Sequence, residues 1–102
     1  MVRKVKWTKR AQRERKDILQ YWINRNKSST YSKKLSQLFK EAINLLIIKP
    51  KIGRLTDIED VRIKVVRDYL IFYEFDNECL YILAIWDSRQ DPNKLKIKGT
   101  GR

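Results

Sequence analysis

The spacing of the apolar residues changes at Pro50, and this change constrains the fold more than any other feature of the sequence. Before Pro50, apolar residues recur every three or four positions, as they do along one face of an amphipathic helix. After Pro50 they alternate with polar residues or form short continuous runs, which is typical of strands. Helices that precede the strands, instead of alternating with them, favour an α+β fold.

Two helices are predicted in the first half of the chain, after a short strand at residues 3–7. The first helix has Thr8 as its N-cap and continues to about Asn26. Residues 28–30 mark a break and offer caps for a second helix, which ends before Pro50 and Gly53. Because the link between the helices is short, we expect an antiparallel helical hairpin.

Three strands are predicted in the second half, at residues 61–65, at Tyr69–Phe75 and at residues 79–86. The last of these is apolar on both faces, which indicates a central, buried strand. The expected order is β-α-α-β-β-β, with the helical hairpin packed on one face of a small antiparallel sheet. A single domain is expected at residues 1–95, followed by a basic tail at residues 96–102.

The chain is strongly basic, and the charge is unevenly placed. It carries 24 Lys and Arg against 12 Asp and Glu, a net charge of +12 on 102 residues. Residues 1–54 hold 16 basic and 3 acidic side chains, whereas residues 55–102 are close to neutral. Such an excess favours an acidic protein or nucleic acid as partner. The candidate surface for an acidic partner is on the first helix: Lys9, Arg10, Arg13, Arg15 and Lys16.

The composition excludes several chemistries. There is no histidine, so neither an imidazole base nor a histidine metal site is possible. The single cysteine, Cys79, excludes an internal disulfide and a cysteine cluster for zinc. The three glycines form no phosphate-binding loop, and no stretch resembles a signal peptide or a membrane span. We therefore expect a cytoplasmic protein without cofactor, metal or membrane contact, whose chemistry uses Arg, Lys, Tyr or carboxylates.

The turn after the last predicted strand is the strongest candidate site. Four basic residues lie on or near the last strands: Arg62, Lys64, Arg67 and Arg89. One interpretation is that they converge on a phosphate, because guanidinium groups match phosphate oxygens in pairs. The alternative is that Arg89 forms an ion pair with Asp87 or Asp91 and holds the turn together. Among the aromatic residues of the strands, Tyr69 is the candidate for a functional role.

These segments resemble a known family. Trp7 before the first helix, Pro50 after the second, and the runs VRIKVVRDYLIFYEF and ILAIWDSRQDP are similar to the RelE/ParE superfamily of toxins from bacterial type II toxin–antitoxin systems. The resemblance extends over about residues 2–95. It implies a small α+β toxin domain that a co-expressed acidic antitoxin silences, and operator DNA contacted only through the complex of the two.

Two branches of the superfamily have different targets. RelE-like members cut mRNA on the ribosome with Arg, Lys and Tyr or His, whereas ParE-like members inhibit DNA gyrase. The nuclease branch has an arginine where this sequence has Leu70, and its C-terminal Tyr or His has no counterpart in residues 93–102. Arg62 and Arg89 do match basic positions of that branch. The resemblance thus favours a ParE-like inhibitor of DNA gyrase.

Three hypotheses remain open from the sequence. The first is a gyrase inhibitor, in which Arg67 and Arg89 are candidates for binding the target. The second is a metal-independent, ribosome-dependent endoribonuclease, in which Arg62 and Arg89 hold the phosphate while Lys64 or Tyr69 transfers a proton. The third is an inactive member that only binds its antitoxin.

Overall fold

The computed structural model describes residues 2–97. Its elements are β1 (Lys4–Trp7), α1 (Lys9–Asn26), α2 (Thr30–Ile48), η1 (Pro50–Ile52), β2 (Arg54–Leu55), β3 (Arg62–Val66), β4 (Tyr69–Phe75), β5 (Cys79–Asp87) and η2 (Pro92–Lys94), where η marks a short 3-10 helix. The α+β class and the predicted order of elements are confirmed. The structure adds β2, a two-residue strand that is too short to leave a periodic signal in the sequence.

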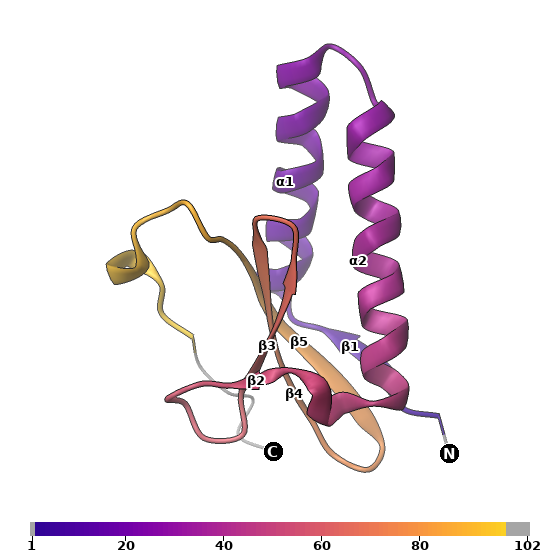
Figure 1. The fold of residues 1–102 in the computed structure, drawn as a ribbon, viewed down its shortest axis with the longest axis vertical. Coiled ribbons are helices and arrows are strands. Elements are labelled where there is room, and N and C mark those ends of the chain that lie inside the picture. Colours follow the sequence, from indigo (N-terminus) through magenta and orange to yellow (C-terminus); the bar gives the residue numbers. More distant parts are fainter. Residues whose placement is uncertain (1, 98–102) are drawn as a thin grey trace.

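The helices form an antiparallel hairpin that stands on one side of the sheet (Figure 1). Thr8 fixes where this hairpin begins. Its hydroxyl oxygen accepts a hydrogen bond from the backbone N–H of Ala11 at 3.1 Å and donates one to the carbonyl of Leu83 at 2.9 Å. The N-cap therefore also attaches the start of α1 to β5. Among the residues described, no helix is long and apolar enough to cross a membrane.

The sheet has the strand order β1-β5-β4-β3-β2. Neighbours from β2 to β5 are antiparallel, but β1 pairs with β5 in parallel. The sheet is thus mostly antiparallel, as the sequence predicts, and the structure adds that its first strand pairs in parallel at one edge. Parallel neighbours need a long connection, and the helical hairpin together with β2, β3 and β4 supplies one. The strand predicted at residues 79–86 is an interior one, with β1 and β4 as its neighbours, and β4 is the middle one of the five strands that the structure describes.

The main core lies between the helices and one face of the sheet. The largest fully buried side chains on this side include Phe39 of α2 and Tyr69 and Tyr73 of β4. Because side chains alternate along a strand, Tyr69, Ile71 and Tyr73 all point toward the helices. Burial of these large side chains is the main stabilising contribution to the fold.

The opposite face of the sheet has a smaller apolar cluster. Val61, Phe72, Leu83 and Ala84 form its buried centre. The C-terminal segment covers part of this face, because Leu95 and Ile97 pack against the cluster. The first two residues of the predicted basic tail are thus held near the sheet, and residues 98–102 lie outside the described part of the chain.

Candidate functional site

Arg89 lies in the exposed turn after β5 and is bound to Asp87. Its Nε and Nη2 donate to the two carboxylate oxygens of Asp87 at 2.9 Å and 2.8 Å, and its backbone N–H donates to the same carboxylate at 2.9 Å. These hydrogen bonds lower the pKa of Asp87. Of the two alternatives for Arg89 in the sequence, the structure shows the ion pair with Asp87. The side chain of Arg89 remains 49% exposed.

An aromatic pair lies beneath this arginine. The guanidinium of Arg89 is 5.8 Å from the ring centre of Trp22 on α1, a cation–π distance. Nε1 of Trp22 donates to the hydroxyl of Tyr69 at 2.7 Å. Tyr69 is 2% exposed, and burial raises its pKa, an effect that the hydrogen bond from Trp22 partly opposes. Its hydroxyl is therefore neutral at pH 7 and shielded from solvent, which makes it a poor proton acceptor.

Arg62 lies far along the sheet from Arg89. It pairs with Tyr73 across β3 and β4, while Asp87 pairs with Tyr69 across β4 and β5. The four residue-to-residue steps from Tyr69 to Tyr73 span about 13 Å of strand. Arg62 is also engaged elsewhere, because its Nη1 donates to the carbonyls of Lys51 and Gly53 at 3.1 Å and 2.8 Å.

The other two basic residues of this predicted set lie near α2 instead. Lys64 pairs with Ile71 in the sheet, and its side chain lines a groove beside α2. Arg67 is exposed at the tip of the β3–β4 hairpin with a positive φ of 56°, and it lines the same groove. Leu70 pairs with Trp86 and packs in the cluster on the face of the sheet away from the helices. The structure thus does not gather these predicted basic residues around one phosphate.

A larger groove, of about 870 Å³, lies between β1, α1 and α2. We call it the basic groove. Its apolar lining is Val5, Trp7, Phe39 and Ile43, and its charged lining is Arg15, Lys16, Lys33 and Lys40. Its remaining lining residues are uncharged and polar, so every charge along it is positive. Such a surface suits a segment that carries both apolar and acidic side chains.

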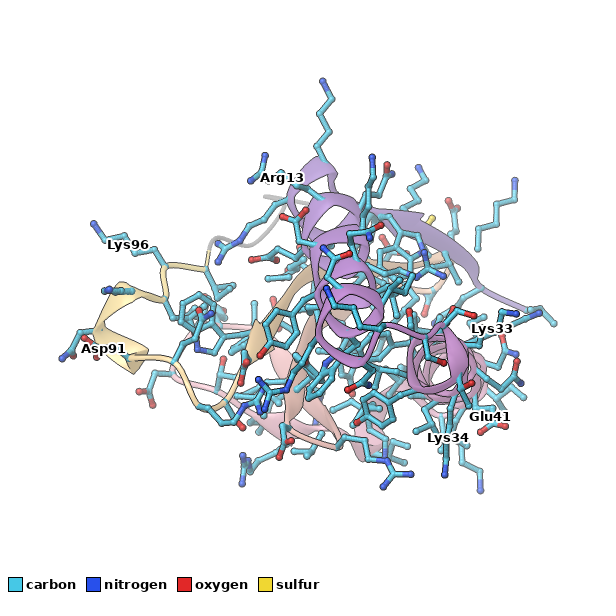
Figure 2. All side chains as sticks on the ribbon, turned by 90° about the horizontal axis from the view of Figure 1, so that it is seen from above. Arg13, Lys33, Lys34, Glu41, Asp91 and Lys96 are labelled. Atoms are coloured by element: carbon cyan, nitrogen blue, oxygen red, sulfur yellow. The ribbon has the colours of Figure 1, made fainter. Side chains whose placement is uncertain are left out.

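Only some of the predicted basic residues of α1 line the basic groove. Arg15 and Lys16 line the basic groove, and Arg15 is held there by a 3.1 Å hydrogen bond from Nη2 to the hydroxyl of Ser36. Arg10 pairs with Glu14 at 3.2 Å and donates to the carbonyl of Lys96. Lys9 and Arg13 are exposed outside the groove lining, and Arg13 extends from α1 to solvent in Figure 2.

Sequence reasoning missed the contribution of α2 to this groove. Lys33 and Lys40 are seven residues apart, a spacing that places them on the same side of a helix. That signal was available in the sequence. Which side of α2 lies next to α1 and β1 depends on how the two helices pack, and this comes from the structure.

Comparisons with known proteins agree with this fold. Residues 5–92 match the profile of a family described as ParE toxin of type II toxin-antitoxin system, parDE. A solved structure described as "Chromosomal ParDE TA system from P. aeruginosa" is similar, with a TM-score of 0.69 and 18% identity, covering 82% of this chain and 94% of that chain. No curated protein matches the sequence. At 18% identity the structural likeness shows the fold, whereas the profile covers most of the chain and shows the family. The chain belongs to the ParE toxin family of type II toxin–antitoxin systems.

Proposed function

We propose that this toxin acts in the cytoplasm by binding and inhibiting DNA gyrase, and that it does not cut RNA. The observation that carries the proposal is the separation of the basic residues that a nuclease would need together. Arg62 is bound to backbone carbonyls near one end of β4, and Arg89 is paired with Asp87 near the other. A scissile phosphate has to contact its stabilising and proton-transferring groups at the same time.

The candidates for proton transfer support the same conclusion. Tyr69 is buried, and its hydroxyl is bonded to Trp22 beneath the surface, out of reach of a bound RNA strand. Lys64 faces the groove beside α2, several residues along the sheet from Arg89. Leu70 supplies no positive charge where the nuclease branch has an arginine. An inhibitor that acts by docking needs none of these groups.

The first experiment measures DNA synthesis and protein synthesis together by pulse labelling after this chain alone is induced in bacteria. We expect DNA synthesis to fail first, followed by a DNA-damage response. A supercoiling assay with purified gyrase and micromolar toxin should then show inhibition. Protein synthesis that stops first, with cleaved mRNA on ribosomes, would contradict the proposal in favour of the endoribonuclease. Harmless expression would indicate an inactive member.

The cognate antitoxin, a partner that the toxin–antitoxin family implies, is proposed to bind in the basic groove. The apolar floor and the all-positive charge of the groove favour an acidic segment that orders on binding. Charge attraction also speeds association, and salt screens it with a Debye length of about 8 Å at physiological ionic strength. We therefore expect the association rate to fall steeply as salt is added.

A matched pair of charge reversals tests this groove. Lys16 and Arg13 are both exposed basic residues of α1, but only Lys16 lines the groove. Lys16→Glu should slow association with the antitoxin at least tenfold at low salt, whereas Arg13→Glu should change it less than threefold. Stopped-flow mixing at several salt concentrations measures both rates. Equal effects of the two variants would place the antitoxin elsewhere, and a rate independent of salt would show that charge does not guide the pair.

A further inference from the structure

A second groove, of about 320 Å³, lies on the opposite flank of α2. We call it the edge groove. Its lining is Leu38, Glu41, Ala42 and Leu45 from α2, and Lys64, Val65, Val66 and Arg67 from β3 and the turn after it. None of these residues lines the basic groove. In Figure 2, which looks down on the helices, Lys33 of the basic groove and Glu41 of the edge groove leave α2 on different sides.

The edge groove exposes large apolar side chains. Leu45 is 40% exposed and Val65 is 51% exposed, although both lie in regular secondary structure. Ile48, one helical turn after Leu45, is 71% exposed and continues the apolar stripe toward the end of α2. In a domain of this size, grouped exposed apolar residues indicate a surface that binds another molecule.

One wall of the edge groove is an open strand edge. β2 pairs only with Arg62 and Ile63 of β3. From Lys64 to Val66, β3 has no strand neighbour on that side among residues 2–97. Unpaired backbone groups at a sheet edge accept an added strand, and the side chains beside the edge then select the sequence that is bound.

The charges around the edge groove indicate the chemistry of its occupant. Lys64 and Arg67 line the groove together with one acid, Glu41. Outside the groove lining, the segment that follows α2 carries three further exposed positive side chains, those of Lys49, Lys51 and Arg54. An extended segment with apolar side chains and an excess of carboxylates would therefore complement this surface.

We propose that the edge groove is the surface with which the toxin docks on its protein target. An extended, acidic and apolar segment of the target pairs beside β3, and its alternating side chains lie against Leu45 on the helix side of the sheet and against Val65 on the other side. The proposal rests on the proposed function, in that the chain acts by binding a target and not by cutting RNA. The target is assigned to the edge groove because the basic groove, with its uniformly positive charge, already suits the acidic antitoxin.

Two substitutions, one on each side of the open β3 edge, test the proposal: Leu45→Glu on α2 and Val65→Glu on the opposite face of the sheet. Each removes an exposed apolar contact and adds a negative charge that repels an acidic segment. Tyr21→Glu is the control, because Tyr21 is also a large exposed apolar residue, at 48%, but lies on α1 outside both grooves. The readouts are growth arrest in bacteria, inhibition of gyrase supercoiling, neutralisation by the co-expressed antitoxin, and thermal unfolding of the purified chain.

We expect the two groove variants to need at least tenfold more toxin for the same growth arrest and the same gyrase inhibition. Tyr21→Glu should stay within twofold of the wild type. All three should unfold within a few degrees of the wild type, and the antitoxin should still neutralise residual toxicity. If one groove variant does not fold, the other decides the test.

Several outcomes would overturn the proposal. Full growth arrest by both groove variants would show that the edge groove does not bind the target. Loss of neutralisation with toxicity intact would assign the groove to the antitoxin. If the wild type arrests growth without inhibiting gyrase and the groove variants do not arrest growth, the gyrase proposal fails and the docking surface stands. A wild-type chain that arrests nothing contradicts both proposals.

Discussion

Each end of β4 joins a buried tyrosine to a nearby arginine, but the two ends are built differently. At one end, the hydroxyl of Tyr73 donates to the carbonyl of Pro50 at 2.6 Å and accepts from the N–H of Gly53 at 2.9 Å. Arg62 donates to the carbonyl of Gly53 as well. The partners at this end are thus backbone groups, and together they fix the segment between α2 and β2.

At the other end, the partners are side chains. Tyr69 accepts a hydrogen bond from Trp22, whose ring lies under the guanidinium of Arg89, and Arg89 is paired with Asp87. Both tyrosines are buried, whereas the side chain of Arg89 is about half exposed. The same residue types on the same face of a strand therefore stabilise the chain connection at one end and leave a charged group available to a partner at the other.

The largest effect is expected from adding a methyl group at Gly53, next to Tyr73. A Cβ at Gly53 would overlap the hydroxyl and ring of Tyr73, which is enclosed by the core and cannot turn away. We expect Gly53→Ala to lower the free energy of unfolding by about 3 kcal/mol, at the upper end for overpacked cores. Urea denaturation measures the change. The double variant Gly53→Ala, Tyr73→Phe should lose less than the sum of the two single changes. Wild-type stability of Gly53→Ala would show that the Tyr73 ring can move.

Removing each hydroxyl in turn compares the two ends directly. Tyr73→Phe leaves the carbonyl of Pro50 and the N–H of Gly53 buried without their partner, which should cost about 2 kcal/mol. Tyr69→Phe removes only the acceptor of the Trp22 indole N–H, at a cost of about 1 kcal/mol. Both values come from denaturant unfolding at pH 7. A larger loss of unfolding free energy for Tyr69→Phe than for Tyr73→Phe would show that the Tyr69 hydroxyl stabilises the fold more.

The same hydroxyls should make the chain sensitive to alkaline pH. Burial raises the pKa of both Tyr69 and Tyr73 above the ordinary value of 10.0. Above about pH 10, the unfolded chain loses these protons while the folded chain keeps them. Stability is therefore complete below pH 10 and falls as the pH rises through the folded-state pKa, by at most about 1.4 kcal/mol per pH unit for each tyrosine. Unfolding measured from pH 9 to 11 should show this fall, and it should be shallower in Tyr73→Phe. An unchanged slope in that variant would exclude Tyr73 as a cause.

Local sequence patterns predicted most of the fold. The arrangement of the site depends on contacts between distant segments, which these patterns do not contain. The start of α1 followed from the Thr8 cap, and β4 was predicted residue for residue, because caps and periodicity are properties of neighbouring residues. The parallel pairing of β1 joins segments more than 70 residues apart, so no local pattern contains it. Of the two alternatives for Arg89, convergence with Arg62 is not seen, for the same kind of reason. It depended on strand register, which the β3–β4 hairpin sets by pairing Arg62 with Tyr73.

The smallest effect on stability is expected at the exposed arginine. Arg89→Ala removes an ion pair in contact with water, which is worth less than about 1 kcal/mol. Arg62→Ala should cost more, about 1–2 kcal/mol, because two backbone carbonyls lose a charged donor. Because Arg89→Ala is expected to leave the fold intact, any loss of activity in this variant reflects the missing guanidinium and not unfolding.

If the wild type cuts ribosome-bound mRNA and Arg89→Ala does not, the exposed end of β4 is a nuclease site and the gyrase proposal fails. If neither cuts mRNA, the result agrees with the proposal that Arg62 and Arg89 lie too far apart to form a nuclease site.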